Sequence, residues 1–166
     1  KIFSIQSGLG VPYGTYFGAV VATQVAGNIQ SDFINMSFGL SPEEEPQALR
    51  CAVEYAIAQG ATIITSAGND ALNVDAAPQW PAAFSIVYFP QLVSVTSYNY
   101  PPGGFPELDP TLSGFSNFGL SSTNLAAYLT AKTPAFNGGV GEFTYLAGTS
   151  ISAPLLTSAV ATEFSD

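Results

Sequence analysis

The stretch Gly148-Thr149-Ser150-Ile151-Ser152-Ala153-Pro154 contains the strongest structural pattern in the chain. It follows a predicted strand at 142–146 and opens a predicted helix at 150–163 that is rich in small residues. Ser150 would therefore lie at the positive end of a helix dipole, where its own backbone N–H can donate to a developing oxyanion. Pro154 is compatible with a helix if it falls in the first turn. Taken alone, the same pattern is typical of an ordinary serine cap.

A second polar turn, Ser66-Ala67-Gly68-Asn69-Asp70, ends a β-branched run at 61–66 that predicts a central strand. Sites in α/β proteins are built at the carboxyl ends of such strands. The side-chain amide of Asn69 can donate a hydrogen bond to an oxyanion. Taken alone, the segment is an ordinary Asn-Asp turn.

Strands and helices alternate along the rest of the chain. The apolar spacing predicts helices at 15–26 and 41–59 and strands at 32–38 and 91–97, with an irregular loop at 76–90. For the second helix, Ser41-Pro42-Glu43 supplies a capping serine, a proline and an acid at the expected start. This order predicts a three-layer α/β fold, with a largely parallel sheet and helices on both faces. A length of 166 residues fits a single domain over 1–166.

Composition excludes several classes of function. Apolar residues make up 47% of the chain, which is enough for a core, while the net charge of −9 disfavours contact with nucleic acid. Every long uncharged stretch is interrupted by polar residues, Gly or Pro, so no membrane span is predicted. Cys51 is the single cysteine, and Asp70 with Asp75 offers too few ligands for Ca²⁺, so we predict no metal and no cofactor. The chain contains no histidine, the usual general base near neutral pH.

Four segments together resemble the subtilisin-like serine peptidases, the subtilase family. They are, in family order, Ile34–Gly39, Ser66–Asn69, Phe115–Gly119 and Gly148–Pro154. The resemblance implies that Ser150 occupies the nucleophile position and Asn69 the oxyanion position. It also implies a substrate-binding role for six residues, namely Ser37, Phe38, Gly39, Ser66, Ala67 and Gly68. Family habit, together with the scarcity of lysine, favours an extracellular or secreted location.

The resemblance weakens toward the N-terminus. The family places a catalytic Asp after a hydrophobic strand, and here Gln6 stands in that position within Phe3–Gly8. The family then opens a helix with His-Gly-Thr-His, and here Tyr13 takes the place of the histidine in Tyr13–Tyr16. Between Ala26 and Asp32 the chain is shorter than the family pattern. The sequence therefore predicts a trimmed and degenerate subtilase domain.

These substitutions remove the expected route for proton transfer. A serine hydroxyl is a weak nucleophile until a neighbouring base takes its proton. A tyrosine phenol ordinarily has a pKa near ~10, so Tyr13 would be a poor proton acceptor at neutral pH. Gln6 carries no charge that could stabilise a protonated base. The sequence therefore favours a pseudopeptidase with a structural or protein-binding role, whose partner is a protein or peptide, including a further copy of the same chain.

Three alternatives stay open. The chain could be a serine endopeptidase that uses Ser150 and Asn69 with a base supplied from elsewhere. Acid-active sedolisins use a helix Glu and an oxyanion Asp, but residues 2–31 contain no acid and Asn69 is not Asp. A carbohydrate or small-ligand module would rest on aromatic content alone.

Overall fold

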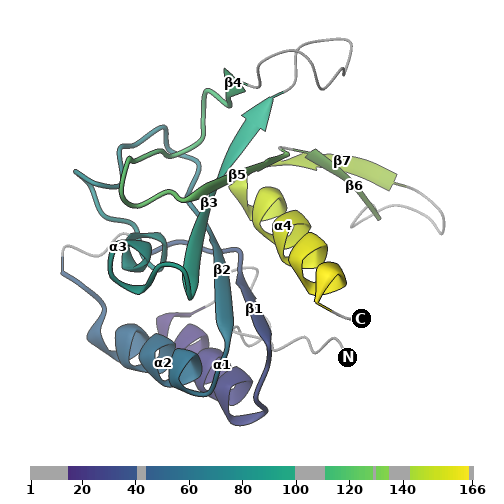
Figure 1. Ribbon diagram of the computed structural model, residues 1–166. Coiled ribbons are helices and arrows are strands. Elements are labelled where there is room, and N and C mark those ends of the chain that lie inside the picture. Colours follow the sequence, from purple (N-terminus) through teal and green to yellow (C-terminus); the bar gives the residue numbers. More distant parts are fainter. Residues whose placement is uncertain (1–14, 41–43, 100–110, 129, 135–142, 165–166) are drawn as a thin grey trace.

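A parallel sheet organises the computed structural model, which describes residues 15–40, 44–99, 111–128, 130–134 and 143–164 (Figure 1). The strands of the main sheet are β1 (Phe33–Met36), β2 (Thr62–Ser66), β3 (Leu92–Asn99), β4 (Thr111–Leu112) and β5 (Leu125–Tyr128). All pairings among them are parallel except that of β4 with β3, which is antiparallel. A separate antiparallel pair consists of β6 (Thr130–Pro134) and β7 (Phe143–Ala147).

Helices cover both faces of the main sheet (Figure 1). On one face α1 (Tyr16–Asn28) packs against α2 (Gln47–Ala58), and on the other face α4 (Thr149–Glu163) packs against β1, β2, β3 and β5. This arrangement confirms the predicted three-layer α/β fold with a largely parallel sheet. The predicted helix at 15–26 and the predicted strands at 32–38, 61–66 and 91–97 are also confirmed, with small shifts at their ends.

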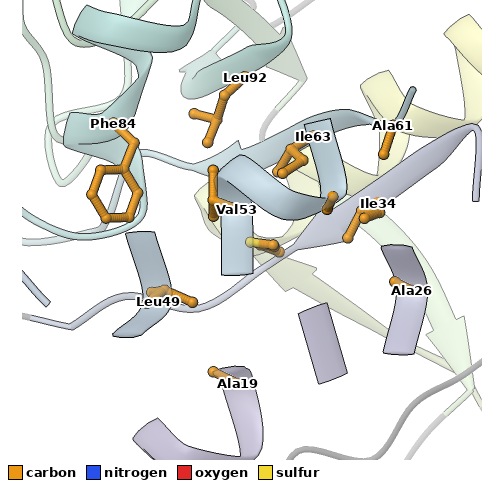
Figure 2. Packing of buried hydrophobic residues seen from close by; sticks show 11 residues of the cluster. Ala19, Ala26, Ile34, Leu49, Val53, Ala61, Ile63, Phe84 and Leu92 are labelled. Atoms are coloured by element: carbon orange, nitrogen blue, oxygen red, sulfur yellow. The ribbon is translucent and has the colours of Figure 1, made fainter. Parts of the chain in front are cut away.

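Alternating side chains of the strands build two apolar clusters. Ile63 of β2 is fully buried on the α1–α2 side, where it packs with Leu49 and Val53 (Figure 2). Its neighbour Ile64 points to the opposite side and joins a cluster that contains Ala153 of α4. Because successive strand residues face opposite sides of a sheet, one short β-branched strand anchors helices on both faces.

The start of the second helix differs from the prediction. Residues 41–43 lie outside the described residues, and α2 begins at Gln47, with Pro46 in the capping position and no acid in the first turn. Proline tolerates a helix start because the N–H that it lacks would have no partner inside the helix. A first-turn N–H of α2, that of Leu49, donates instead to the hydroxyl of Tyr16 at 3.2 Å. A tertiary contact thus supplies the hydrogen-bond acceptor for a first-turn N–H that the sequence predicted from a serine cap.

Two further expectations need correction. The segment 76–90 is not wholly irregular, because it contains a 3₁₀ turn at Ala82–Phe84 and a short helix, α3 (Ser85–Tyr88). Pro154 lies inside α4 rather than in its first turn, since α4 already begins at Thr149. Proline has no N–H, so it cannot donate to the carbonyl of Ser150 one turn earlier.

Candidate active site: nucleophile and oxyanion positions

The ends of two parallel strands meet the start of α4 at one edge of the sheet. There an open pocket of about 220 Å³ is lined by residues from all three elements and their loops. Its lining residues are Gly39, Ser66, Gly68, Asn69, Asp70, Gln79, Thr149 and Ser150. The structure therefore brings the predicted nucleophile and oxyanion residues into one pocket, although they lie far apart in the sequence.

The orientation of the Asn69 amide follows from its hydrogen bonds. Its Oδ1 accepts from the backbone N–H of Thr149 at 2.9 Å and from the Thr149 hydroxyl at 3.0 Å. Because a backbone N–H can only donate, the oxygen of the amide must face α4. No described residue accepts a hydrogen bond from Nδ2 of Asn69, so this donor is available to a ligand in the pocket.

Ser150 supplies a second donor to the same pocket. It is the second residue of α4, so its backbone N–H has no acceptor within the helix. The N–H groups of Ile151 and Ser152 already donate to the carbonyl of Gly148. The pair formed by Asn69 Nδ2 and Ser150 N–H, together with the helix dipole, suits a ligand oxygen that carries negative charge.

The Ser150 hydroxyl is hydrogen-bonded to a carbonyl and not to a base. Its Oγ donates to the carbonyl oxygen of Ser37 at 3.3 Å. A carbonyl oxygen cannot take the proton at neutral pH, so this contact holds the hydroxyl without activating it. Among the described residues, no titratable side chain is hydrogen-bonded to Ser150.

Thr149 links the start of α4 to the loop that follows β2, a role that the sequence did not reveal. It is fully buried, and its hydroxyl accepts from the backbone N–H of Gly68 at 3.1 Å while donating to Asn69. Gly68 has a φ of +106°, and a Cβ at this position would lie 2.2 Å from Nδ2 of Asn117. The loop that follows β2 can therefore approach the side chains of Asn117 and Gln79 only with a glycine here.

Asn117, within the segment Phe115–Gly119, holds the loop over 67–72 through side-chain hydrogen bonds. It is fully buried, and its Oδ1 accepts from the N–H groups of Asp70 at 3.0 Å and Leu72 at 2.9 Å. Its Nδ2 donates to the carbonyl of Ala67 at 2.9 Å and to Oε1 of Gln79 at 3.1 Å. One side chain therefore makes hydrogen bonds with four groups in and beside the loop over 67–72, which carries Asn69.

The predicted substrate-binding residues fall into two groups. Ser66, Gly68 and Gly39 line the pocket, and Ser37 meets Ser150 through its carbonyl. Phe38 instead packs against the apolar cluster under α1 and α2, and Ala67 is fully buried beneath the loop. These last two residues therefore do not line the pocket.

Gln6 and Tyr13 lie outside the described residues. The helix that follows them, α1, is capped by the hydroxyl of Thr15, which accepts from the N–H of Gly18 at 2.9 Å. This helix packs on α2, across the sheet from the helix that carries Ser150 (Figure 1). The identification of these two residues with the triad positions stays a prediction.

A carboxylate outside the pocket, that of Asp75, organises the loop after Asn117. It accepts from the backbone N–H groups of Leu120 at 2.8 Å, Ser121 at 3.1 Å and Ser122 at 2.9 Å. The Ser122 side chain and these N–H groups hold the pKa of Asp75 below its usual range. The Ser122 hydroxyl faces the carboxylate but does not complete a hydrogen bond of good geometry. Partial burial opposes the shift without cancelling it.

Replacing Asp75 by asparagine is expected to lower the Tm at neutral pH. A carboxyl whose pKa is lower in the folded chain stabilises the fold above the unfolded pKa of about 3.9 and loses that effect as the pH falls through the folded value. The difference in Tm between Asp75→Asn and the unmodified chain should therefore shrink below about pH 4. Thermal unfolding followed between neutral and acidic pH measures it, and Asp32→Asn, at an exposed site, is the control. A difference that stays constant with pH would contradict this account.

Within the described ranges, no group of three or more His, Cys, Asp or Glu side chains is arranged to hold a metal ion. In the same part of the chain, every helix is too short or too polar to cross a lipid bilayer.

The fold and the pocket define an α/β protein in which Ser150 and Asn69 lie together at the carboxyl ends of parallel strands. The chain belongs to the subtilase family, because the family model Peptidase S8, described as Subtilase family, matches residues 4–165. This confirms the resemblance drawn from the four sequence segments. No curated protein matches the chain in a sequence comparison.

Solved structures of subtilisin-like proteases resemble this fold. A cold adapted subtilisin-like serine proteinase is 26% identical with a TM-score of 0.68, and the alignment covers 91% of this chain and 48% of that one. The epidermin leader peptide processing serine protease (EpiP) from Staphylococcus aureus is 22% identical with a TM-score of 0.70, covering 92% and 45%. A psychrophilic protease is 22% identical with a TM-score of 0.73, covering 93% and 51%. The chain thus spans about half the length of these relatives.

Proposed function

We propose that this domain binds extended peptides at a subtilase site without hydrolysing them. The observation that carries the proposal is the state of Ser150 and its neighbours. Asn69 and Ser150 line the pocket, and two of their donors, Asn69 Nδ2 and Ser150 N–H, have no acceptor among the described residues, whereas the Ser150 hydroxyl donates to a carbonyl. The site is therefore equipped to hold a carbonyl or carboxylate oxygen, but among the described residues no side chain that could act as a base is hydrogen-bonded to Ser150.

The absence of histidine from the sequence supports this function. Of the remaining side chains, Tyr13 is the residue that the family pattern places in the position of the base, and a neutral phenol does not take a proton from serine. A protein or peptide partner fits such a site, because an extended segment can add a strand beside the end of β1. The assembly role and the extracytoplasmic location stay predictions, the latter supported by the habit of the family.

Binding of an oxyanion-like ligand tests this proposal. A blocked peptide that ends in a free carboxylate should bind more tightly than the same peptide ending in an amide, because the carboxylate accepts from both donors. In Asn69→Asp, the new side chain keeps an acceptor for Thr149 but replaces the Nδ2 donor with a negative oxygen. We expect the affinity for the acid peptide to fall about tenfold, and the affinity for the amide peptide, whose carbonyl oxygen carries no charge, to fall less, by about threefold. Fluorescence anisotropy of labelled peptides measures both.

Asn73→Asp is the matched control, because it adds the same negative charge on an exposed loop, where the side chain, among the described residues, accepts from the N–H of Asp75 alone. It should change neither affinity. Failure of both peptides to bind the unmodified chain would refute the proposal, as would an affinity for both peptides that Asn69→Asp leaves unchanged.

A second candidate function is that of a serine endopeptidase that uses Ser150 with a base supplied from elsewhere, such as another chain. The preserved donor pair at Asn69 and Ser150 favours it, since stabilising an oxyanion is useful mainly during turnover. The relatives with which the chain aligns are about twice as long. Free imidazole supplied in solution tests this candidate, because an exogenous base should restore hydrolysis that depends on Ser150. Hydrolysis that is equal in the unmodified chain and in Ser150→Ala at every imidazole concentration would exclude it.

A further inference from the structure

A second pocket shares no lining residue with the one beside Ser150. Its volume is about 150 Å³, and its walls include the aromatic rings of Trp80, Phe84 and Tyr88. The ring centroids of Trp80 and Phe84 lie 4.6 Å apart, and those of Phe84 and Tyr88 lie 6.2 Å apart. Sites for free small molecules usually measure roughly 300–1,000 Å³, whereas an apolar cavity of about 150 Å³ holds one benzene ring. The pocket therefore has the size of a single side chain.

The short helix α3 carries apolar side chains that the fold does not bury. Phe84, directly before α3, is 2% exposed, and Tyr88 contacts its ring one turn later. Between them, Ile86 and Val87 line the pocket and are nevertheless 52% and 64% exposed. Phe89, directly after α3, is 57% exposed. Large apolar side chains exposed beside an apolar pocket are typical of a surface that binds another protein.

The charged groups around this pocket are mostly acidic. Glu45, Arg50 and Asp75 line it. The guanidinium of Arg50 already donates to Glu45 at 2.9 Å and to Glu54 at 3.1 Å. The ion pairs of the described chain do not include Asp75, so no described cation neutralises its charge. Three carboxylates thus accompany one guanidinium, and a partner that carries lysine or arginine complements this charge.

We propose that this second pocket is a docking site for a protein partner that inserts one aromatic side chain flanked by lysine or arginine. The inserted ring packs on the rings of Trp80 and Phe84, since aromatic side chains favour tilted and offset contacts with one another. The flanking cations lie near Glu45 and Asp75. The inference does not rest on the proposed binding at Ser150, because the two pockets share no lining residue.

The fluorescence of Trp80 reports on this pocket directly, because Trp80 is the single tryptophan of the chain. Three blocked pentapeptides are titrated against the purified chain. They are Gly-Lys-Phe-Lys-Gly, its alanine version with Ala in place of Phe, and its glutamate version with Glu in place of both Lys. The first should bind about tenfold more tightly than the alanine version, because only the phenyl ring fills the pocket. It should bind about fivefold more tightly than the glutamate version at low salt, and added salt should reduce this preference.

Substitutions at exposed residues locate the binding without disturbing the core. Val87→Ser removes an apolar side chain from the pocket wall and should weaken the phenylalanine–lysine peptide about threefold. Its control is Val21→Ser, which changes an exposed valine on α1 and should have no effect. Glu45→Gln keeps an oxygen for Arg50 and should roughly halve the preference for lysine over glutamate. Glu163→Gln, the same change at an exposed position of α4, should leave that preference as it is.

Four results would overturn the proposal. The first is Trp80 fluorescence that no peptide changes, and the second is equal binding of the phenylalanine and alanine versions. The third is a loss of binding that Val21→Ser shares with Val87→Ser, which would place the peptide elsewhere on the chain. The fourth is a dimer, detected by sedimentation velocity, that forms in the unmodified chain and is absent in Val87→Ser, since a second copy would then occupy the surface. Each leaves the proposed function at Ser150 untouched, because that site is tested with its own peptides and variants.

Discussion

Hydrolysis of a blocked peptide anilide by the purified chain is expected to be no faster than hydrolysis by its Ser150→Ala variant. In subtilisin, removing either the serine or the histidine of the triad lowers kcat by roughly 10⁶-fold. This chain contains no histidine, and its Ser150 hydroxyl donates to the carbonyl of Ser37. Removing the hydroxyl should therefore have no further effect. Release of the chromophore over several days measures the two rates.

Ser158→Ala serves as the control, since Ser158 is an exposed serine on the same helix. All three proteins should give the same background rate. A rate in the unmodified chain and in Ser158→Ala that disappears in Ser150→Ala would show that Ser150 is an activated nucleophile. The pseudopeptidase proposal would then be wrong.

Replacing Asn117 by alanine is expected to lower the free energy of unfolding by about 4 kcal/mol. The side chain is fully buried and holds the loop over 67–72 through its hydrogen bonds. Alanine would leave four groups without this partner, namely the N–H groups of Asp70 and Leu72, the carbonyl of Ala67 and Oε1 of Gln79. Each buried unsatisfied group costs about 1–3 kcal/mol. Water entering the space would recover part of this loss, which is why the expected total is below the sum. Chemical denaturation measures the change.

The same substitution at Asn73 provides the comparison. Asn73 is exposed and accepts one hydrogen bond, from the N–H of Asp75 at 3.0 Å, so Asn73→Ala should cost no more than about 1 kcal/mol. If Asn117→Ala were as stable as Asn73→Ala, the hydrogen bonds of Asn117 would not be what holds the loop over 67–72. Peptide binding by Asn117→Ala should also be lost, because the loop carries Asn69.

The layers of the fold were predictable because they depend on local patterns. The β-branched run that forms β2 and the small residues that form α4 each specify an element and the face it buries. Together with the strand at 33–36, they place Ser150 and Asn69 at one edge of the sheet. The meeting of Ser150 and Asn69, the predicted nucleophile and oxyanion residues, in one pocket could therefore be inferred from sequence.

The start of α2 could not be predicted, because it depends on a distant residue. Ser41-Pro42-Glu43 and Pro46 both carry helix-start chemistry, and local rules do not choose between them. In the structure Pro46 is the capping residue, and the N–H of Leu49 donates to the hydroxyl of Tyr16, which belongs to another helix. The roles of Thr149 and Asn117 were missed for the same reason, since each bridges segments that meet only in the folded chain.

The central claim is that this chain can hold a peptide carbonyl but cannot activate Ser150. The most direct test is the rate at which a fluorophosphonate labels each serine of the purified chain, located by mass spectrometry of its fragments. The account predicts that Ser150 is labelled no faster than Ser158, the exposed serine on the same helix. Rapid and selective labelling of Ser150 would contradict it, because only a serine with a working base reacts in that way.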